Sequence, residues 1–262
     1  MHQNHHQKTE SHLKIHTVTI SGADDQTPPN QLLAISEAYP FVEWGILLTP
    51  GQEPRQRYPT LAWIHQLESL MNGAMKVSGH VCGGWAKKIC RGQFSEELDR
   101  PMFTRMQLNL AHFIAREISD FGTIASCLPM DREYIVQVGA AEHEGLRLAH
   151  ALQNHGHLTS VLFDASGGHG LTPDRWPEPV SNLKCGFAGG LSPHNLENQL
   201  RILSAHVGDT TMWIDMESGV RTEDGQELDL DKVRACLDIV QPYVAKGRKE
   251  NGSNQYKNKV GP

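Results

Sequence analysis

The sequence predicts a single (β/α)8 barrel of the TIM type, in the α/β class. Eight short apolar or β-branched runs alternate with segments whose apolar residues recur at helical spacing. These units fit into about 230 residues, the usual size of such a barrel. An open doubly wound sheet has the same alternation, but no Gly-x-Gly-x-x-Gly sequence follows the first run, and eight units are many for that fold. We therefore expect the barrel.

The strands and helices can be placed in order along the chain. The first run is β-branched and ends at a Ser-Gly turn, the third ends in Cys-Gly-Gly, and the fourth is the least marked of the eight. In the first half we expect strands at residues 17–20, 41–48, 76–81 and 105–109, with helices at 31–38, 61–71 and 111–119 and a further helical segment directly after residues 82–84. In the second half we expect strands at 134–138, 160–164, 183–188 and 211–215, with helices at 142–154, 195–205 and 231–245.

The folded part is expected to be one domain at residues 17–246, between two polar tails. Residues 1–16 carry five of the fifteen histidines and few apolar residues, so a disordered tail is expected there. Residues 247–262 are equally polar and are expected to be flexible. Neither tail contributes to the predicted core.

Composition excludes several classes of protein. The net charge of −6 argues against nucleic-acid binding. No stretch approaches ~20 apolar residues, and no apolar secretory segment is found near the N-terminus, so we expect no membrane partner and a cytoplasmic location. The five cysteines are widely spaced and form no Cys-x-x-Cys pair, which favours a reduced chain without a metal or cofactor. A monomer or a homodimer is expected.

Glycine-rich segments follow the last three predicted strands. They are DASGGHG at residues 164–170, AGGLSPHN at 188–195 and DMESGV at 215–220. In a barrel, loops at the carboxyl ends of strands 7 and 8 form the usual phosphate site, and glycine lets backbone N–H groups approach an anion. Ser192-Pro193 suits a helix start there. The residues expected to bind phosphate are Gly167, Gly168, Gly189, Gly190, Ser218 and Gly219.

The same segments carry a resemblance to phosphoribosylanthranilate isomerase. The stretch 161–176 resembles that family's sixth-strand segment, 187–195 resembles its Gly-Gly-Leu-x-Pro-x-Asn phosphate loop, and 214–220 resembles its Asp-x-x-Ser-Gly-Val segment. Earlier in the chain, residues 19–22, 57–58 and 106–109 fall where the family has Lys-Ile-Cys-Gly, Arg-Tyr and Val-Gln-Leu-His. The resemblance therefore covers most of the predicted barrel.

The resemblance implies an Amadori rearrangement of a phosphorylated aldosylamine to a 1-amino-ketose, a step of tryptophan biosynthesis. In the family the strand-6 aspartate is the general acid, which Asp164 matches, and an arginine at the position of Arg57 holds the substrate carboxylate. Ser21 stands where the family has its catalytic cysteine, and Asn109 stands where it has a histidine. The identity of the general base is therefore open.

Several residues at the predicted strand ends are candidates for the missing base or for contacts with a small phosphorylated substrate. Cys82 is a candidate catalytic residue beside Asp164 and Ser21. His80 lies two residues before Cys82, and Asp24 and Asp25 follow Ser21. The expected substrate-binding residues are Arg57, Asn109, Gln137, His169 and Asp215.

Three functions remain open at this stage. The first is an isomerase of the resembled type. The second is a phosphosugar-binding barrel that has lost catalysis together with the cysteine. The third is another phosphosugar enzyme on the same phosphate site, such as an aldolase or an epimerase. A Schiff-base aldolase would need a lysine at a strand end, whereas Lys76 and Lys184 lie at strand beginnings.

Overall fold

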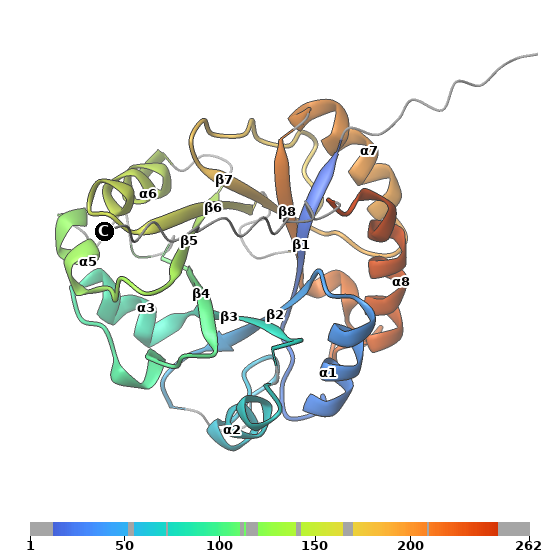
Figure 1. Cartoon of the computed structure of the whole chain (residues 1–262), viewed down its shortest axis with the longest axis horizontal. Coiled ribbons are helices and arrows are strands. Elements are labelled where there is room, and N and C mark those ends of the chain that lie inside the picture. Colours follow the sequence, from blue (N-terminus) through green and yellow to red (C-terminus); the bar gives the residue numbers. More distant parts are fainter. Residues whose placement is uncertain are drawn as a thin grey trace, which may run out of the picture.

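Eight parallel strands form a closed barrel in which each strand pairs with its neighbours in the chain and β8 pairs with β1 (Figure 1). The structure is a computed structural model that describes residues 13–51, 55–71, 73–110, 113, 120–139, 143–164, 170–208 and 210–245. The strands are β1 (Lys14–Ser21), β2 (Val42–Leu48), β3 (Lys76–Val81), β4 (Phe103–Leu108), β5 (Glu133–Gly139), β6 (Leu158–Asp164), β7 (Lys184–Ala188) and β8 (Thr211–Met216). The predicted fold class is confirmed.

Helices surround the barrel on its outside (Figure 1). They are α1 (Pro29–Ala38), α2 (Leu61–Ser69), α3 (Gly83–Cys90), α5 (Phe121–Cys127), α6 (His143–Asn154), α7 (Leu196–Val207) and α8 (Leu230–Val240). Short 3₁₀ turns occur at Glu96–Leu98, Ser218–Val220 and Gln241–Tyr243. The sequence did not predict α5, and the helix predicted at 111–119 lies outside the described residues except for Phe113. No described helix is long and apolar enough to cross a membrane.

Most predicted boundaries are shifted by one or two residues, and three differences have a clear physical reason. β1 begins at Lys14, before the expected start of the folded part, because Ile15 is fully buried and pairs with Met212. The last α-helix ends at Val240 rather than at Ala245, since Pro242 lies in the 3₁₀ turn that follows. Ser192-Pro193 does not begin α7. The residues from Ser192 to Asn195 instead form a turn, in which the N–H of Asn195 donates to the carbonyl of Ser192 at 3.1 Å.

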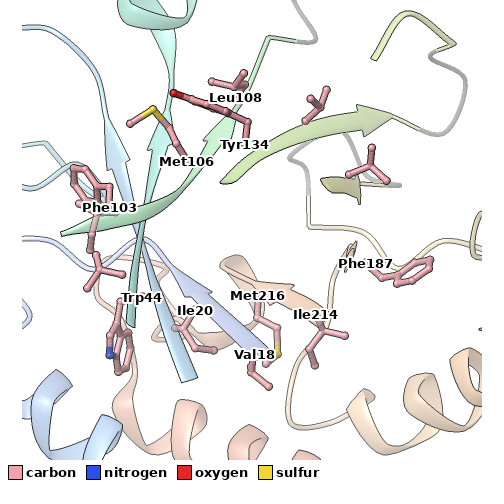
Figure 2. Packing of buried hydrophobic residues seen from close by; sticks show 14 of the residues in the cluster. Val18, Ile20, Trp44, Phe103, Met106, Leu108, Tyr134, Phe187, Ile214 and Met216 are labelled. Atoms are coloured by element: carbon pink, nitrogen blue, oxygen red, sulfur yellow. The ribbon is translucent and has the colours of Figure 1, made fainter. Parts of the chain in front are cut away.

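The main hydrophobic core lies between the strands and the helices. Along β1 and β8, alternate residues point outward into this core. Figure 2 shows Val18 and Ile20 of β1 beside Ile214 and Met216 of β8, in agreement with their strand register. The residues between them in sequence face the inside of the barrel. This alternation places Ser21 and Asp215 inside, at the carboxyl ends of their strands.

The amino-terminal half of the barrel interior contains a buried ion pair. The carboxylate of Glu43 accepts hydrogen bonds from Arg105 Nη1 at 3.0 Å and from Thr19 Oγ1 at 3.0 Å. The Arg105 guanidinium also lies 4.7 Å from the ring centroid of Trp213. Trp213 packs with Ile135 and Leu162 in a small inner cluster. These side chains fill the interior beneath the carboxyl ends of the strands.

Candidate active site

A polar cavity of about 530 Å³ lies at the carboxyl ends of the strands. Every strand contributes a polar or glycine residue to it, directly or through the loop that follows, and β2 does so through Arg57 and Tyr58. Of the residues expected from the sequence, the cavity is lined by Ser21, Arg57, His80, Cys82, Asn109, Gln137, Asp164, Gly189, Gly190, Asp215, Ser218 and Gly219. Gly167, Gly168 and His169 lie outside the described residues.

Ser21 and Asp215 form a buried hydrogen-bonded pair. The Ser21 hydroxyl donates to Asp215 Oδ1 at 3.0 Å, between neighbouring strands. Burial raises the pKa of Asp215 well above its usual value, and the nearby carboxylates of Glu217, Glu43 and Asp164 raise it further. The Ser21 hydrogen bond acts in the opposite direction, because it stabilises the charged form. A carboxylate in this setting is a stronger base than an exposed one.

The space for this pair depends on Gly45. A Cβ at Gly45 would lie 2.5 Å from Ser21 Oγ and 2.6 Å from His80 Cε1, so a larger residue would collide with both side chains. His80 is itself buried and lies 3.2 Å, through Nε2, from Ser78 Oγ. Burial, with Arg105 nearby, lowers the pKa of His80 to about 3. A histidine with this pKa is neutral and takes up a proton poorly at neutral pH.

Asp164 lies at the same level of the barrel as Asp215. Strand register pairs Asp164 with Ala188 and pairs Ala188 with Asp215. The two aspartates are therefore separated by one strand, with ~10 Å between their backbones and a small side chain in between. Gln137 Nε2 donates to Asp164 Oδ2 at 2.8 Å and so orients this carboxyl. Two carboxyls thus face one cavity from opposite sides of Ala188.

Cys82 belongs to a neutral hydrogen-bonded chain on the other side of the cavity. Asn109 Nδ2 donates to Cys82 Sγ at 3.1 Å, and Gln107 Nε2 donates to Asn109 Oδ1 at 2.8 Å. Burial raises the pKa of Cys82 to about 11 and that of Tyr58 to about 12. The Cys82 thiol is therefore protonated at neutral pH, which makes it a poor general base.

The glycine-rich loops after β6, β7 and β8 meet through close backbone contacts. A Cβ at Gly190 would lie 2.6 Å from the carbonyl oxygen of Gly170, and one at Gly219 would overlap the carbonyl of Leu191. Gly190 also has φ +56°, a conformation that favours glycine. Ser218 lies against Gly170, where a Cβ would be 2.9 Å away. The loops can approach one another because these positions have no side chains.

Asn195 holds the β7 loop in shape. Its Nδ2 donates to the carbonyl of Gly190 at 2.8 Å, and its Oδ1 accepts from the N–H of Ser192 at 2.9 Å. The asparagine that ends the phosphate-loop motif therefore fixes the loop from within, and it stands at the N-cap position of α7 without a side-chain capping hydrogen bond. No local pattern in the sequence indicates this role.

Arg57 lies at the rim of the cavity in an ion pair. Its Nη1 is 2.7 Å from Glu217 Oε1, and its backbone N–H donates to Asp24 Oδ2 at 2.6 Å. Asp24 in turn lies 3.8 Å from Arg221 Nη2. Asp25 accepts hydrogen bonds from Thr60 N and Oγ1. Asp24 and Asp25 line a neighbouring pocket rather than the main cavity.

Five polar or glycine residues that line the cavity were not expected as site residues, nor was Gly45, which makes room for two of the lining side chains; the five are Tyr58, Gly83, Gln107, Gly170 and Glu217. A signal was present for two of them. Glu217 lies two residues after Asp215, and Gln107 lies two residues before Asn109. Alternation along a strand therefore points each of them toward the same interior. Nothing in the sequence indicated that Gly45 makes room for two polar neighbours.

The fold and the cavity define a class of protein: a (β/α)8 barrel whose polar side chains and glycine loops gather at the carboxyl ends of its strands. Within this class, the chain resembles the N-(5'phosphoribosyl)anthranilate (PRA) isomerase family, whose model matches residues 123–239. The matched segment contains Asp164, Asp215 and the β7 and β8 loops. Ser21 and Cys82 lie outside it.

Two solved structures share the fold. Phosphoribosyl anthranilate isomerase from Thermus thermophilus has 19% identity and a TM-score of 0.57, over 86% of this chain and 98% of its own. Phospho-2-dehydro-3-deoxyheptonate aldolase from Thermotoga maritima has 14% identity and a TM-score of 0.52, over 87% of this chain and 68% of its own. No curated protein sequence matches the chain. At these identities the structural similarity shows the fold alone.

Proposed function

We propose that this chain is an isomerase that converts a phosphorylated aldosylamine into a 1-amino-ketose by an Amadori-type rearrangement. The observation that carries the proposal is the placement of Asp164 and Asp215 on either side of Ala188, facing one cavity. The reaction needs one group that gives a proton and another that removes one. Both carboxyls lie in the segment that resembles the PRA isomerase family, whose name describes this reaction class.

The phosphate of the substrate would bind at the loops after β7 and β8. The positions without side chains at Gly189, Gly190 and Gly219 leave backbone accessible along the cavity wall. The Ser218 hydroxyl supplies a further donor there. Phosphate at this end of the cavity would place the sugar over the centre of the barrel, between the two carboxyls.

Asp164 would act as the general acid. In its protonated form it gives its proton to the ring oxygen of the sugar, the C1–O bond breaks, and the nitrogen lone pair forms the C1=N bond. The product of this step is an open-chain iminium ion. The hydrogen bond from Gln137 holds the acid in place during the step.

Asp215, oriented by Ser21, would act as the general base in place of the family's cysteine. Its carboxylate takes the proton from C2, the C2–H electrons form the C1=C2 bond, and the iminium nitrogen recovers its lone pair. The resulting enolamine gives the 1-amino-ketose when C1 is protonated and the C2 hydroxyl loses its proton. The reaction therefore requires the form in which Asp164 is protonated and Asp215 is ionised, and the raised pKa of Asp215 opposes that form. The neutral Cys82 thiol and the buried His80 would support the site without transferring a proton.

One observation favours a second function, which is phosphosugar binding without catalysis. Ser21 stands at the position of the family's catalytic cysteine, and a hydroxyl alone is a poor base. A Schiff-base aldolase is less well supported. Lys76 and Lys184 begin β3 and β7, at the end of the barrel opposite the cavity.

Titration followed by a turnover assay tests the proposal. The ligand for calorimetry is a ring-opened ribitol 5-phosphate carrying an aryl amine at C1, which mimics the open-chain intermediate. The turnover assay uses N-aryl ribosylamine 5-phosphates formed from ribose 5-phosphate and a set of aryl amines. Binding with turnover that is lost in Asp164→Asn supports the isomerase. Binding without turnover for every amine would favour the second function, and no binding would contradict both.

A further inference from the structure

The cation at the rim of the cavity is already neutralised by this chain's own carboxylates. Arg57 and Glu217 both line the cavity, and their ion pair is 2.7 Å long with side chains 32% and 33% exposed. Arg57 is also anchored through its backbone, because its N–H donates to Asp24 at 2.6 Å. An incoming carboxylate would have to share Arg57 with Glu217 or displace it.

The charges around Arg57 balance without a ligand. Arg57 and Arg221 carry two positive charges, and Asp24 and Glu217 carry two negative charges within the same set of contacts. Arg55 stacks on Tyr58, 4.2 Å from the ring centroid, and lines the neighbouring pocket with Asp24 and Asp25. Counting Arg55 and Asp25, which both line that pocket, the described residues around the rim carry three positive and three negative charges, so the group has no net positive charge to offer a substrate carboxylate.

The rest of the described lining is neutral or acidic. Apart from Arg57, the ionisable side chains there are the carboxyls of Asp164, Asp215 and Glu217, the neutral thiol and phenol of Cys82 and Tyr58, and the neutral imidazole of His80. A ligand carboxylate in this part of the cavity would meet like charges.

Gln107 adds an acceptor that lacks a donor. It lines the cavity at 5% exposure, and within the described part of the chain its buried Oε1 has no hydrogen-bond partner. Its Nε2 is occupied by Asn109. A buried acceptor without a donor is destabilising, so a ligand N–H or ammonium group at this position would be favourable.

We propose that the site takes a phosphorylated sugar amine whose non-phosphate end carries neutral or cationic hydrogen-bond donors and no carboxylate. This inference rests on the proposed function and narrows its substrate class. Glu217 is the residue that determines the preference, because it cancels Arg57 and presents its own oxygens to the ligand. The substrate would then differ from phosphoribosylanthranilate at the end farthest from the phosphate.

The test compares three ribitol 5-phosphate amines, made from anthranilate, from anthranilamide and from 2-aminobenzylamine. They share the phosphate and the sugar chain and differ in one substituent, which is anionic, neutral or cationic. We expect the wild type to bind the carboxamide and the aminomethyl compound about tenfold more tightly than the carboxylate. This is the size of effect that repulsion between the ligand carboxylate and one carboxylate of the partly exposed site produces. In Glu217→Gln, which frees Arg57, the carboxylate should gain about tenfold relative to the carboxamide.

Glu223→Gln is the matched control. Glu223 is 92% exposed, follows β8 as Glu217 does, and pairs with Lys232 outside the cavity. The control removes the same charge from the chain and should leave the order of the three ligands unchanged. A wild type that binds the carboxylate as tightly as the carboxamide would overturn the substrate class while leaving the proposed function in place. Failure to bind any of the three would overturn the proposed function and this inference together.

Discussion

The Ser21 hydroxyl donates a hydrogen bond to Asp215 from the neighbouring strand, at 3.0 Å, inside the closed barrel. Through this contact the strand that carries serine in place of the family's cysteine remains coupled to a basic group. The carboxylate that accepts the bond is buried, and its pKa is raised chiefly for that reason. In the proposed mechanism these two residues together supply the base that the family's cysteine would otherwise provide.

Replacing the proposed base should abolish turnover and preserve binding. Asp215→Asn keeps the size of the side chain and an acceptor for Ser21, but it cannot take up a proton. We expect the turnover rate to fall by about 10²–10⁴-fold, the usual contribution of a general base. Calorimetry with the ring-opened ligand should give a dissociation constant within about threefold of wild type, since the phosphate loops are untouched. A variant that turns over at the wild-type rate would exclude Asp215 as the base.

Loss of the Ser21 hydroxyl should move the pH profile to higher pH. The hydrogen bond from Ser21 lowers the pKa of Asp215, so its removal in Ser21→Ala raises that pKa further. Because the base must be ionised, kcat/KM falls as the pH drops through the pKa of Asp215. This acidic limb should therefore begin at higher pH in Ser21→Ala than in wild type. Profiles that superimpose would show that Ser21 does not act on the ionisation of Asp215.

The buried Asp215 carboxyl should lower the free energy of unfolding at neutral pH. Its folded pKa is raised, so the folded state releases the Asp215 proton less readily than the unfolded chain, and stability falls as the pH rises above the unfolded value. Asp215→Asn should therefore be more stable than wild type near neutral pH. The difference should vanish below about pH 3, where the aspartate is protonated in both states. Urea unfolding at several pH values measures this, and a destabilised variant at neutral pH would be the opposite of the expected result.

A methyl group at Gly190 should weaken phosphate binding. Its Cβ would lie 2.6 Å from the carbonyl of Gly170, so Gly190→Ala forces the β6 and β7 loops apart. Gly208→Ala is the matched control, because Gly208 has a similar φ of +60° and no atom within 4 Å of a Cβ. Both variants carry the cost of backbone strain, and only Gly190→Ala should lose about tenfold or more in affinity for ribose 5-phosphate. Equal affinities would contradict the placement of the phosphate.

Breaking the buried ion pair beneath the cavity by replacing one partner should destabilise the fold more than replacing both partners. Glu43→Gln leaves the Arg105 guanidinium, whose side chain is 11% exposed, without its closest carboxylate and should destabilise the fold by about 3 kcal/mol. The double variant Glu43→Leu/Arg105→Met removes both charges and should be less destabilised than Arg105→Met or Glu43→Leu alone. Urea unfolding of the four proteins gives the coupling free energy. Additive losses would show that the two charges do not interact.

Strand ends could be predicted from the sequence, because alternation and the turn residues mark them locally. β3 was predicted with its observed bounds, and Asp164, Asp215 and Gly190 were placed at the mouth of the barrel from their positions after apolar runs. The side-chain pairs that form between distant loops could not be predicted. The pairing of Arg57 with Glu217 joins loops 160 residues apart, and no local pattern encodes it.

Boundaries that depend on tertiary contacts were also missed. The expected tail included Leu13 and Ile15, which are both buried. A register shift between Ile15 and Thr17 interrupts the alternation that would join them to Val18, and the pairing with β8 shows that Ile15 belongs to the strand. The start of α7 was placed too early, since Ser-Pro is a common helix start and the Asn195 hydrogen bonds that shape the turn are not visible in sequence. The role of Gly45 follows from the two side chains above it, which come from different strands.

The fate of the C2 proton of the substrate in D₂O tests the proposed acid–base isomerisation most directly. The wild type is incubated in D₂O with an N-aryl ribosylamine 5-phosphate that carries a neutral aryl group, and the C2 proton is followed by NMR. With Asp215 as the base, we expect the wild type to remove the C2 proton as the 1-amino-ketose forms. The Asp215→Asn variant should leave the C2 proton in place. Retention of the C2 proton by a wild type that binds the ring-opened ligand would contradict acid–base isomerisation in this barrel.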